Sequence, residues 1–182
     1  LKEMQEKRNL KNYGGKANFE ELLSKCTQIM KLIRELPQPV IAEVHGVAAA
    51  AGCQLVATCD IAIASEEASF GVNGVDIGLF CSSPMVALSR IISRKKAFEM
   101  LTTGDFLDPF EAEKLGLINK VANSKDLSDT SLDIAKKIAS KLYLAVKIGK
   151  QAFYKQADME IDDAYSYASD VIVENLLYKE TN

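Results

Sequence analysis

One stretch of the chain, residues 40–65, constrains the possible fold more than any other. Residues 40–44 form a short apolar run typical of a buried strand, and a turn at His45-Gly46 follows. Residues 48–57 have the composition of a helix, and residues 60–65 are a second buried strand. Because two parallel strands need a crossover connection, this order predicts a βαβ unit. The sequence therefore predicts an α/β protein with a parallel sheet packed on helices.

Helices are expected on both sides of this unit. Apolar residues at steps of three and four predict a helix over residues 19–36, which ends before Pro37, whereas residues 12–15 are expected to form a loop. The glycine-rich residues 70–80 give no clear assignment. Later elements are predicted as helices over 83–92, 95–101 and 109–115, a strand over 117–121, and helices near 127–140, 142–156 and 161–178.

Length and composition place the chain among globular proteins of one domain. The 182 residues are 48% hydrophobic and 26% charged, and they contain no internal repeat and no linker. We expect a single domain over residues 1–182. The formal net charge of −3 argues against nucleic acid as a partner, because a phosphate-binding protein normally carries a basic excess. No apolar run approaches the roughly 18 residues of a membrane span, so a membrane is not expected as a partner.

The cysteines and the single histidine exclude several kinds of site. The four cysteines lie among apolar neighbours without a C-x-x-C pair, as expected for reduced thiols in an intracellular protein. With one histidine, no metal site is expected, and a Ser-His-Asp triad would have to include His45.

Small residues dominate the start of the helix that follows the first strand. The first amides of a helix have no intrahelical acceptor, and small side chains at Ala48 to Gly52 leave them open to a ligand oxygen. Such amides can form an oxyanion site. The same pattern also fits a small-residue helix packed tightly on a sheet, so both interpretations remain open at this point.

The amino-acid sequences of three segments resemble one known family. The segments PVIAEVHGVAAAAGCQLVATCDIAIASEEASFGVNGVDIGL, LTTGDFLDPFEAEKLGLINKV and the opening LKEM are similar to the crotonase (enoyl-CoA hydratase/isomerase) superfamily. The resemblance implies a crotonase-like spiral of ββα units, with the N-terminal part of the family domain absent. It also implies a core over residues 1–125 and a helical C-terminal region over 126–182 that forms a homotrimer, or a hexamer made of two trimers.

The resemblance further implies an acyl-CoA thioester as the partner, with coenzyme A as part of the substrate and no separate cofactor. The thioester oxygen would be held by two backbone amides, one of which maps to Ala51. Lys2 matches a position near the coenzyme A phosphates, although an exposed helix lysine is an equal alternative. The other substrate-binding positions are Val47, Ala49, Ala50, Gly52, Asn73 and Ile77. The implied location is the cytoplasm in a bacterium and the mitochondrion in a eukaryote.

Two departures from the family pattern affect catalysis. The hydratases of the family carry glutamates at the positions of Gln54 and Gly74, and the isomerases place an acid near Ser82. A general acid or base supplies about 10²–10⁴ in rate, and neither glutamine nor glycine can exchange a proton at neutral pH. Two functions therefore stay open, an enzyme with altered chemistry and a catalytically inactive acyl-CoA-binding or regulatory protein. An RNA-binding or purely structural oligomer is a third class, which would need a basic surface that the composition does not indicate.

Overall fold

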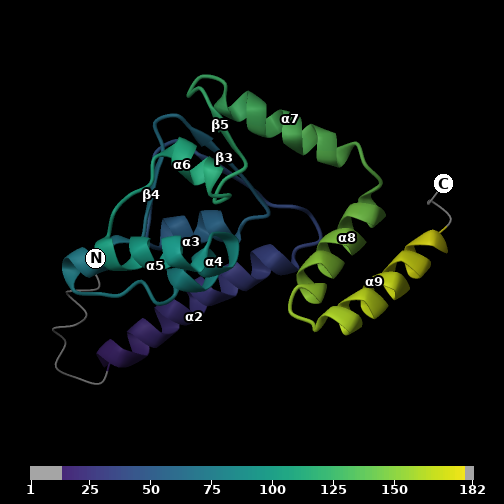
Figure 1. Ribbon diagram of the computed structural model, residues 1–182, viewed down its shortest axis with the longest axis horizontal. Coiled ribbons are helices and arrows are strands. Elements are labelled where there is room, and N and C mark those ends of the chain that lie inside the picture. The colour runs from purple at the N-terminus through teal and green to yellow at the C-terminus, as the bar shows by residue number, and fades with distance from the viewer. Residues whose placement is uncertain (1–13, 179–182) are drawn as a thin grey trace.

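The computed structural model describes residues 14–178 and contains two successive ββα units (Figure 1). The first consists of β1 (Ile41–Val44), β2 (Val47–Ala49) and α3 (Ala51–Thr58). The second consists of β3 (Ile61–Ser65), β4 (Ser69–Gly71), the 3-10 turn η1 (Asn73–Ile77) and α4 (Pro84–Ile91). β1 pairs in parallel with β3, and β2 pairs in parallel with β4. The spiral of ββα units that the resemblance implied is present.

The parallel sheet predicted from the sequence has the strand order β1-β3-β5, with β5 at Lys120–Ala122. The predicted α/β fold class is therefore confirmed. The helix α7 (Leu127–Ala139) packs on β1 and β3. The remaining helices of this part are α2 (Gly14–Glu35), α5 (Arg94–Thr103) and α6 (Pro109–Lys114). A core that includes the fully buried Phe70, Leu88 and Met100 lies among these elements.

Three predicted boundaries are wrong. The first residues of the segment predicted as a helix over 48–57 lie in β2, because pairing with β4 overrides the helical preference of alanine. The strand predicted from residue 117 begins only at Lys120, since the N–H groups of Leu117 and Ile118 donate to the Ala112 carbonyl and close the turn after α6. The loop predicted over 12–15 is already helical at Gly14, where a first-turn glycine costs little.

The last two helices form an antiparallel hairpin beside the rest of the molecule (Figure 1). They are α8 (Tyr143–Gln156) and α9 (Ile161–Leu176), as the sequence predicted. The large hydrophobic side chains of α9 that remain exposed are Ile161, Tyr165, Ile172, Val173 and Leu176. A division into a core over 1–125 and an assembly region over 126–182 stays a prediction. In the part of the chain from 14 to 178, no helix combines the length and the apolar character that a membrane crossing requires.

Candidate functional site

The connection between β2 and α3 has an unusual backbone conformation. Ala50 lies between the two elements with φ 48° and ψ −110°, and it is the only non-glycine residue of the described range 14–178 with positive φ. Its N–H donates to the Gly71 carbonyl at 2.8 Å, which fixes it against the end of β4. A positive φ is strained for alanine, and such strain is concentrated at functional sites.

The first turn of α3 presents free backbone donors. The Gln54 N–H donates to the Ala50 carbonyl at 3.0 Å and closes the turn. The N–H groups of Ala51 and Gly52 have no acceptor among residues 14–178. A Cβ added at Gly52 would meet nothing within 4 Å, so the space around it is open. These amides lie at the positive end of the helix dipole and can receive a carbonyl or anionic oxygen.

Strand pairing brings the start of η1 close to the start of α3. Ala49, the last residue of β2, lies opposite Gly71, the last residue of β4. Because the strands are parallel, α3 and η1 both begin where this small sheet ends. The structure therefore brings Ala49, Ala50 and Ala51 to the same edge as Asn73, the first residue of η1.

Gln54 is a polar residue of α3 that is largely buried. The residue is 7% exposed, and its side-chain amide forms no hydrogen bond with any residue of the described range. The position that the resemblance matched to a family glutamate thus holds a neutral amide.

Gly74, which the resemblance matched to a second family glutamate, has no room for a side chain. A Cβ added at Gly74 would lie 2.6 Å from the Leu79 carbonyl oxygen and 2.9 Å from Cys81 Sγ. The Leu79 N–H donates to the Gly74 carbonyl at 2.9 Å, so the chain folds back tightly on this residue. No local sequence pattern predicts this closure, because it depends on a turn at Gly78 with φ 74°.

The other predicted residues lie in β2, in η1 and in the chain just before α4. Asn73 Nδ2 donates to Asp76 Oδ2 at 3.4 Å, and Ser82 Oγ donates to the Phe80 carbonyl at 3.3 Å. Val47 and Ile77 are exposed hydrophobic residues. Lys2 lies outside the described residues.

Two buried cysteines, Cys53 and Cys81, lie close to these residues, and Cys53 is a poor nucleophile. Burial raises the pKa of the Cys53 thiol from 9.0 to about 12, and the nearby Cys81 adds to this shift. A thiol must ionise to attack or to bind a metal, so Cys53 stays inert near neutral pH. In the described part of the chain, no three His, Cys, Asp or Glu side chains come together as metal ligands.

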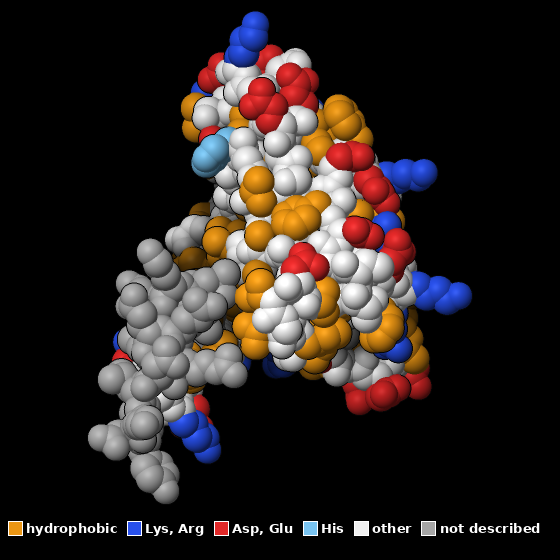
Figure 2. All heavy atoms as spheres, turned by 90° about the vertical axis from the view of Figure 1, so that its left-hand side faces the viewer, with side chains coloured by type: hydrophobic (Ala, Val, Ile, Leu, Met, Phe, Trp, Pro, Cys, Tyr) orange, Lys and Arg blue, Asp and Glu red, His pale blue; other side chains and the backbone are white. Residues whose placement is uncertain are grey.

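Exposed hydrophobic side chains follow Gly74 in the chain. Ile77, Leu79 and Phe80 follow Gly74 and are all exposed. Figure 2 views the molecule from the side on which α5 and β4 lie in Figure 1, and it shows hydrophobic side chains gathered in the middle of this face. An acyl group or another subunit could cover such a surface.

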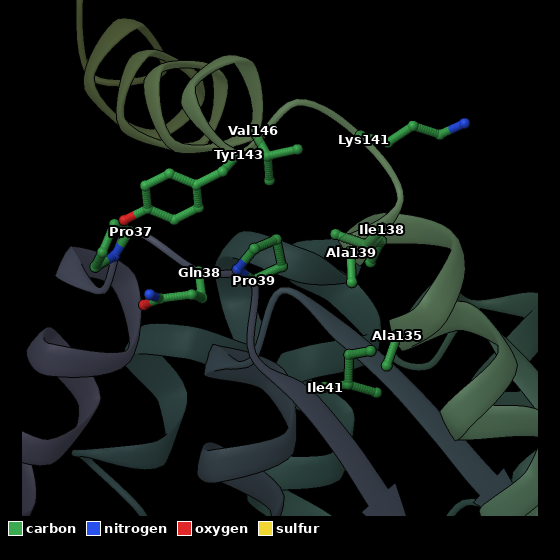
Figure 3. Close-up of a pocket in the computed structure, with 10 residues that line it drawn as sticks. All are labelled: Pro37, Gln38, Pro39, Ile41, Ala135, Ile138, Ala139, Lys141, Tyr143 and Val146. Atoms are coloured by element: carbon green, nitrogen blue, oxygen red, sulfur yellow. The ribbon is translucent and has the colours of Figure 1, made fainter.

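A cavity of about 310 Å³ lies elsewhere, between the chain before β1 and the helices α7 and α8 (Figure 3). Apolar side chains such as Ile41, Ile138 and Val146 form its walls. Figure 3 shows the Lys141 side chain extending away from the cavity, and no unpaired buried polar group lines it. It contains none of the predicted site residues.

Comparison with known proteins supports the sequence resemblance. The sequence model of the family described as enoyl-CoA hydratase/isomerase matches residues 1–180. The mitochondrial enoyl-CoA hydratase domain-containing protein 3 of Rattus norvegicus is 48% identical over 166 residues, which are 91% of this chain and 55% of that protein. A short-chain-enoyl-CoA hydratase of Clostridium acetobutylicum is 34% identical over 81% of this chain and 57% of its own length.

A solved structure shows the same fold. The crystal structure of human enoyl-CoA hydratase domain-containing protein 3 matches with a TM-score of 0.90 and 45% identity, covering 94% of this chain and 68% of that one. An enoyl-CoA hydratase of Mycobacterium smegmatis gives a TM-score of 0.89. The chain spans about half the length of the curated relatives described above.

Proposed function

The chain belongs to the enoyl-CoA hydratase/isomerase family, and from this premise we propose that it binds acyl-CoA thioesters at the first turn of α3. The observation that carries the proposal is the pair of free amides at Ala51 and Gly52 beside the strained Ala50. A thioester carbonyl oxygen is an acceptor that these donors can polarise. The relatives named as enoyl-CoA hydratases support an acyl-CoA as the ligand.

Binding without hydration is the form of this function that the site favours. Gln54 can donate or accept a hydrogen bond but cannot transfer a proton at neutral pH. No side chain is available at Gly74, and the Leu79 carbonyl closes the space where one would lie. An acyl-CoA-binding protein that lacks the two-glutamate reaction therefore fits these residues better than a hydratase does.

Replacing Ala51 by proline tests the backbone-donor model. Proline removes the N–H of this residue, and the first helical position is the one at which a helix tolerates proline best. We expect the affinity for crotonyl-CoA and butyryl-CoA to fall at least about tenfold, the loss expected for a hydrogen bond worth about 1.5 kcal/mol. Gln54→Ala keeps every backbone donor and should weaken binding only slightly. Isothermal titration calorimetry measures both affinities.

Circular dichroism melting provides the control for this comparison. Both variants should keep the helical signal of the parent chain, so that a lost affinity reports the site and not unfolding. Equal losses of affinity in two folded variants would contradict a specific role for the Ala51 amide.

The proposal includes assembly into a homotrimer or a hexamer through α9. Its exposed residues Ile161, Tyr165 and Leu176 lie at helical spacing and leave an apolar stripe without a described neighbour. We expect analytical ultracentrifugation at micromolar concentration to show a trimer or a hexamer. Tyr165→Asp should shift the population toward monomer, because a charge in an apolar interface is costly. A purely monomeric parent chain would refute assembly.

A mitochondrial location in a eukaryotic cell is part of the same proposal. The relatives that carry the name enoyl-CoA hydratase domain-containing protein 3 are described as mitochondrial. Fluorescence microscopy of the protein with a C-terminal tag, expressed in eukaryotic cells, tests this location directly.

A further inference from the structure

A buried charge cluster lies at the opposite end of α3 from the candidate site. Asp60 follows α3 by two residues, and its carboxylate accepts three hydrogen bonds from distant parts of the chain. The Val40 N–H donates to Oδ2 at 2.6 Å, and the Tyr154 hydroxyl donates to Oδ1 at 2.7 Å. The Asp60 N–H in turn donates to the Val40 carbonyl at 3.0 Å. Asp60 therefore fixes the end of α3 to the start of β1.

The third donor to Asp60 is a lysine of α8. Lys150 Nζ lies 2.7 Å from Asp60 Oδ2, and the two side chains are 5% and 13% exposed. The same ammonium donates to the Ile33 carbonyl at 2.8 Å and to the Gln38 carbonyl at 2.9 Å. An ammonium has three N–H groups, and here each has a protein acceptor.

Within residues 14–178, few other contacts fix α8 to the body of the molecule. The cavity of Figure 3 separates Tyr143 and Val146, at the start of α8, from Ile41. One turn beyond Lys150, the Arg34 guanidinium of α2 lies 4.5 Å from the ring centre of Tyr154. The α8–α9 hairpin is thus held by a polar cluster on one side and borders a hollow on the other.

This cluster and the candidate site are joined by a single short helix. α3 has eight residues and is about 12 Å long, with the free amides of Ala51 and Gly52 at one end and Asp60 just beyond the other. Its N-terminal end is fixed by the bond from Ala50 to Gly71. A displacement of Asp60 would therefore move or loosen the helix that presents the donors.

We infer that Lys150 is a positioning residue for the candidate thioester site. Through Asp60 it anchors the C-terminal end of α3, and it thereby couples the docking of the α8–α9 hairpin to the orientation of the amides at Ala51 and Gly52. The coupling to ligand binding rests on the proposed function, whereas the anchoring of α3 does not.

Amide hydrogen exchange of the 182-residue chain tests the anchoring. In Lys150→Met, we expect the backbone amides of residues 54–58 to exchange at least about tenfold faster. The variant loses the ion pair with Asp60, and this loss lowers the free energy needed to open α3 locally. The matched control is Ala164→Gly, which weakens the α8–α9 hairpin at a buried position without touching Asp60. It should accelerate amide exchange in α8 and α9 but leave the exchange rates of α3 within about twofold of those in the parent chain.

A double-mutant cycle tests whether Lys150 acts through Asp60. If it does, adding Lys150→Met to Asp60→Asn should change the α3 exchange rates by less than about twofold. Fully additive effects of the two substitutions would overturn the inference. So would a Lys150→Met variant whose faster exchange is confined to α8 and α9.

Crotonyl-CoA titration separates this inference from the proposed function. Lys150→Met should raise the dissociation constant by about tenfold or more at a temperature where it is fully folded, whereas Ala164→Gly should not. An unchanged dissociation constant with loosened α3 amides would overturn the coupling. If the parent chain does not bind the ligand at all, the proposed function fails, and the exchange rates alone decide whether α3 is anchored by Lys150.

Discussion

Lys150→Met is expected to lower the free energy of unfolding by about 3–5 kcal/mol, the typical cost of removing one partner from a buried ion pair. Methionine matches the length and flexibility of the lysine stem, so packing changes little. The loss comes from the Asp60 carboxylate, which stays buried without a counter-charge, and from the carbonyls of Ile33 and Gln38, which lose their donor. Urea unfolding followed by circular dichroism measures this free energy.

The double variant Asp60→Asn/Lys150→Met provides the control for this loss. It removes both charges, and a buried pair replaced as a whole costs less than a pair broken at one end. The double variant should therefore be more stable than Lys150→Met alone. A single variant within about 0.5 kcal/mol of the parent chain would show that water reaches Asp60 and that the pair is not effectively buried.

Local patterns were sufficient to predict most of the fold. The helices α4, α5 and α6 lie where the sequence predicted helices, and the Asp108 side chain accepts from the Glu111 N–H as the N-cap of α6. The error at β2 has a different origin. Strand formation at Ala48 and Ala49 depends on pairing with β4, about twenty residues later, and no local preference of alanine indicates it.

The candidate site was predictable only in part. The identities of Ala51, Gln54 and Gly74 followed from matching family positions, and the structure places the segments that carry them at one edge of a sheet. The positive φ of Ala50 could not be predicted, because alanine rarely adopts it. The partner of Asp60 could not be predicted either, since Lys150 is 90 residues away in the chain.

Adding a side chain at Gly74 is expected to destabilise the protein. A positive φ is not the obstacle at this position, because the positive-φ glycines of the described range are Gly78, Gly104 and Gly116. The obstacle is instead the Leu79 carbonyl, a backbone atom that cannot rotate away. We expect Gly74→Ala to lower the free energy of unfolding by about 1–3 kcal/mol, the usual cost of overpacking. Thermal melting of Gly74→Ala measures this cost.

The same closure determines what happens when the family's glutamates are restored. Gln54→Glu/Gly74→Glu places two carboxylates in the chain, but the second cannot occupy the space held by Leu79 and Cys81. We therefore expect the double variant to gain less than about tenfold in crotonyl-CoA hydration, well below the roughly 10²–10⁴ that a working acid–base group supplies. Adding Cys81→Ala removes the sulfur contact and leaves the carbonyl contact, so it should recover only part of the lost stability. A folded double variant that hydrates crotonyl-CoA about a hundredfold faster than the parent would mean that the turn at Gly78 opens, and that only the missing carboxylates separate this site from a hydratase.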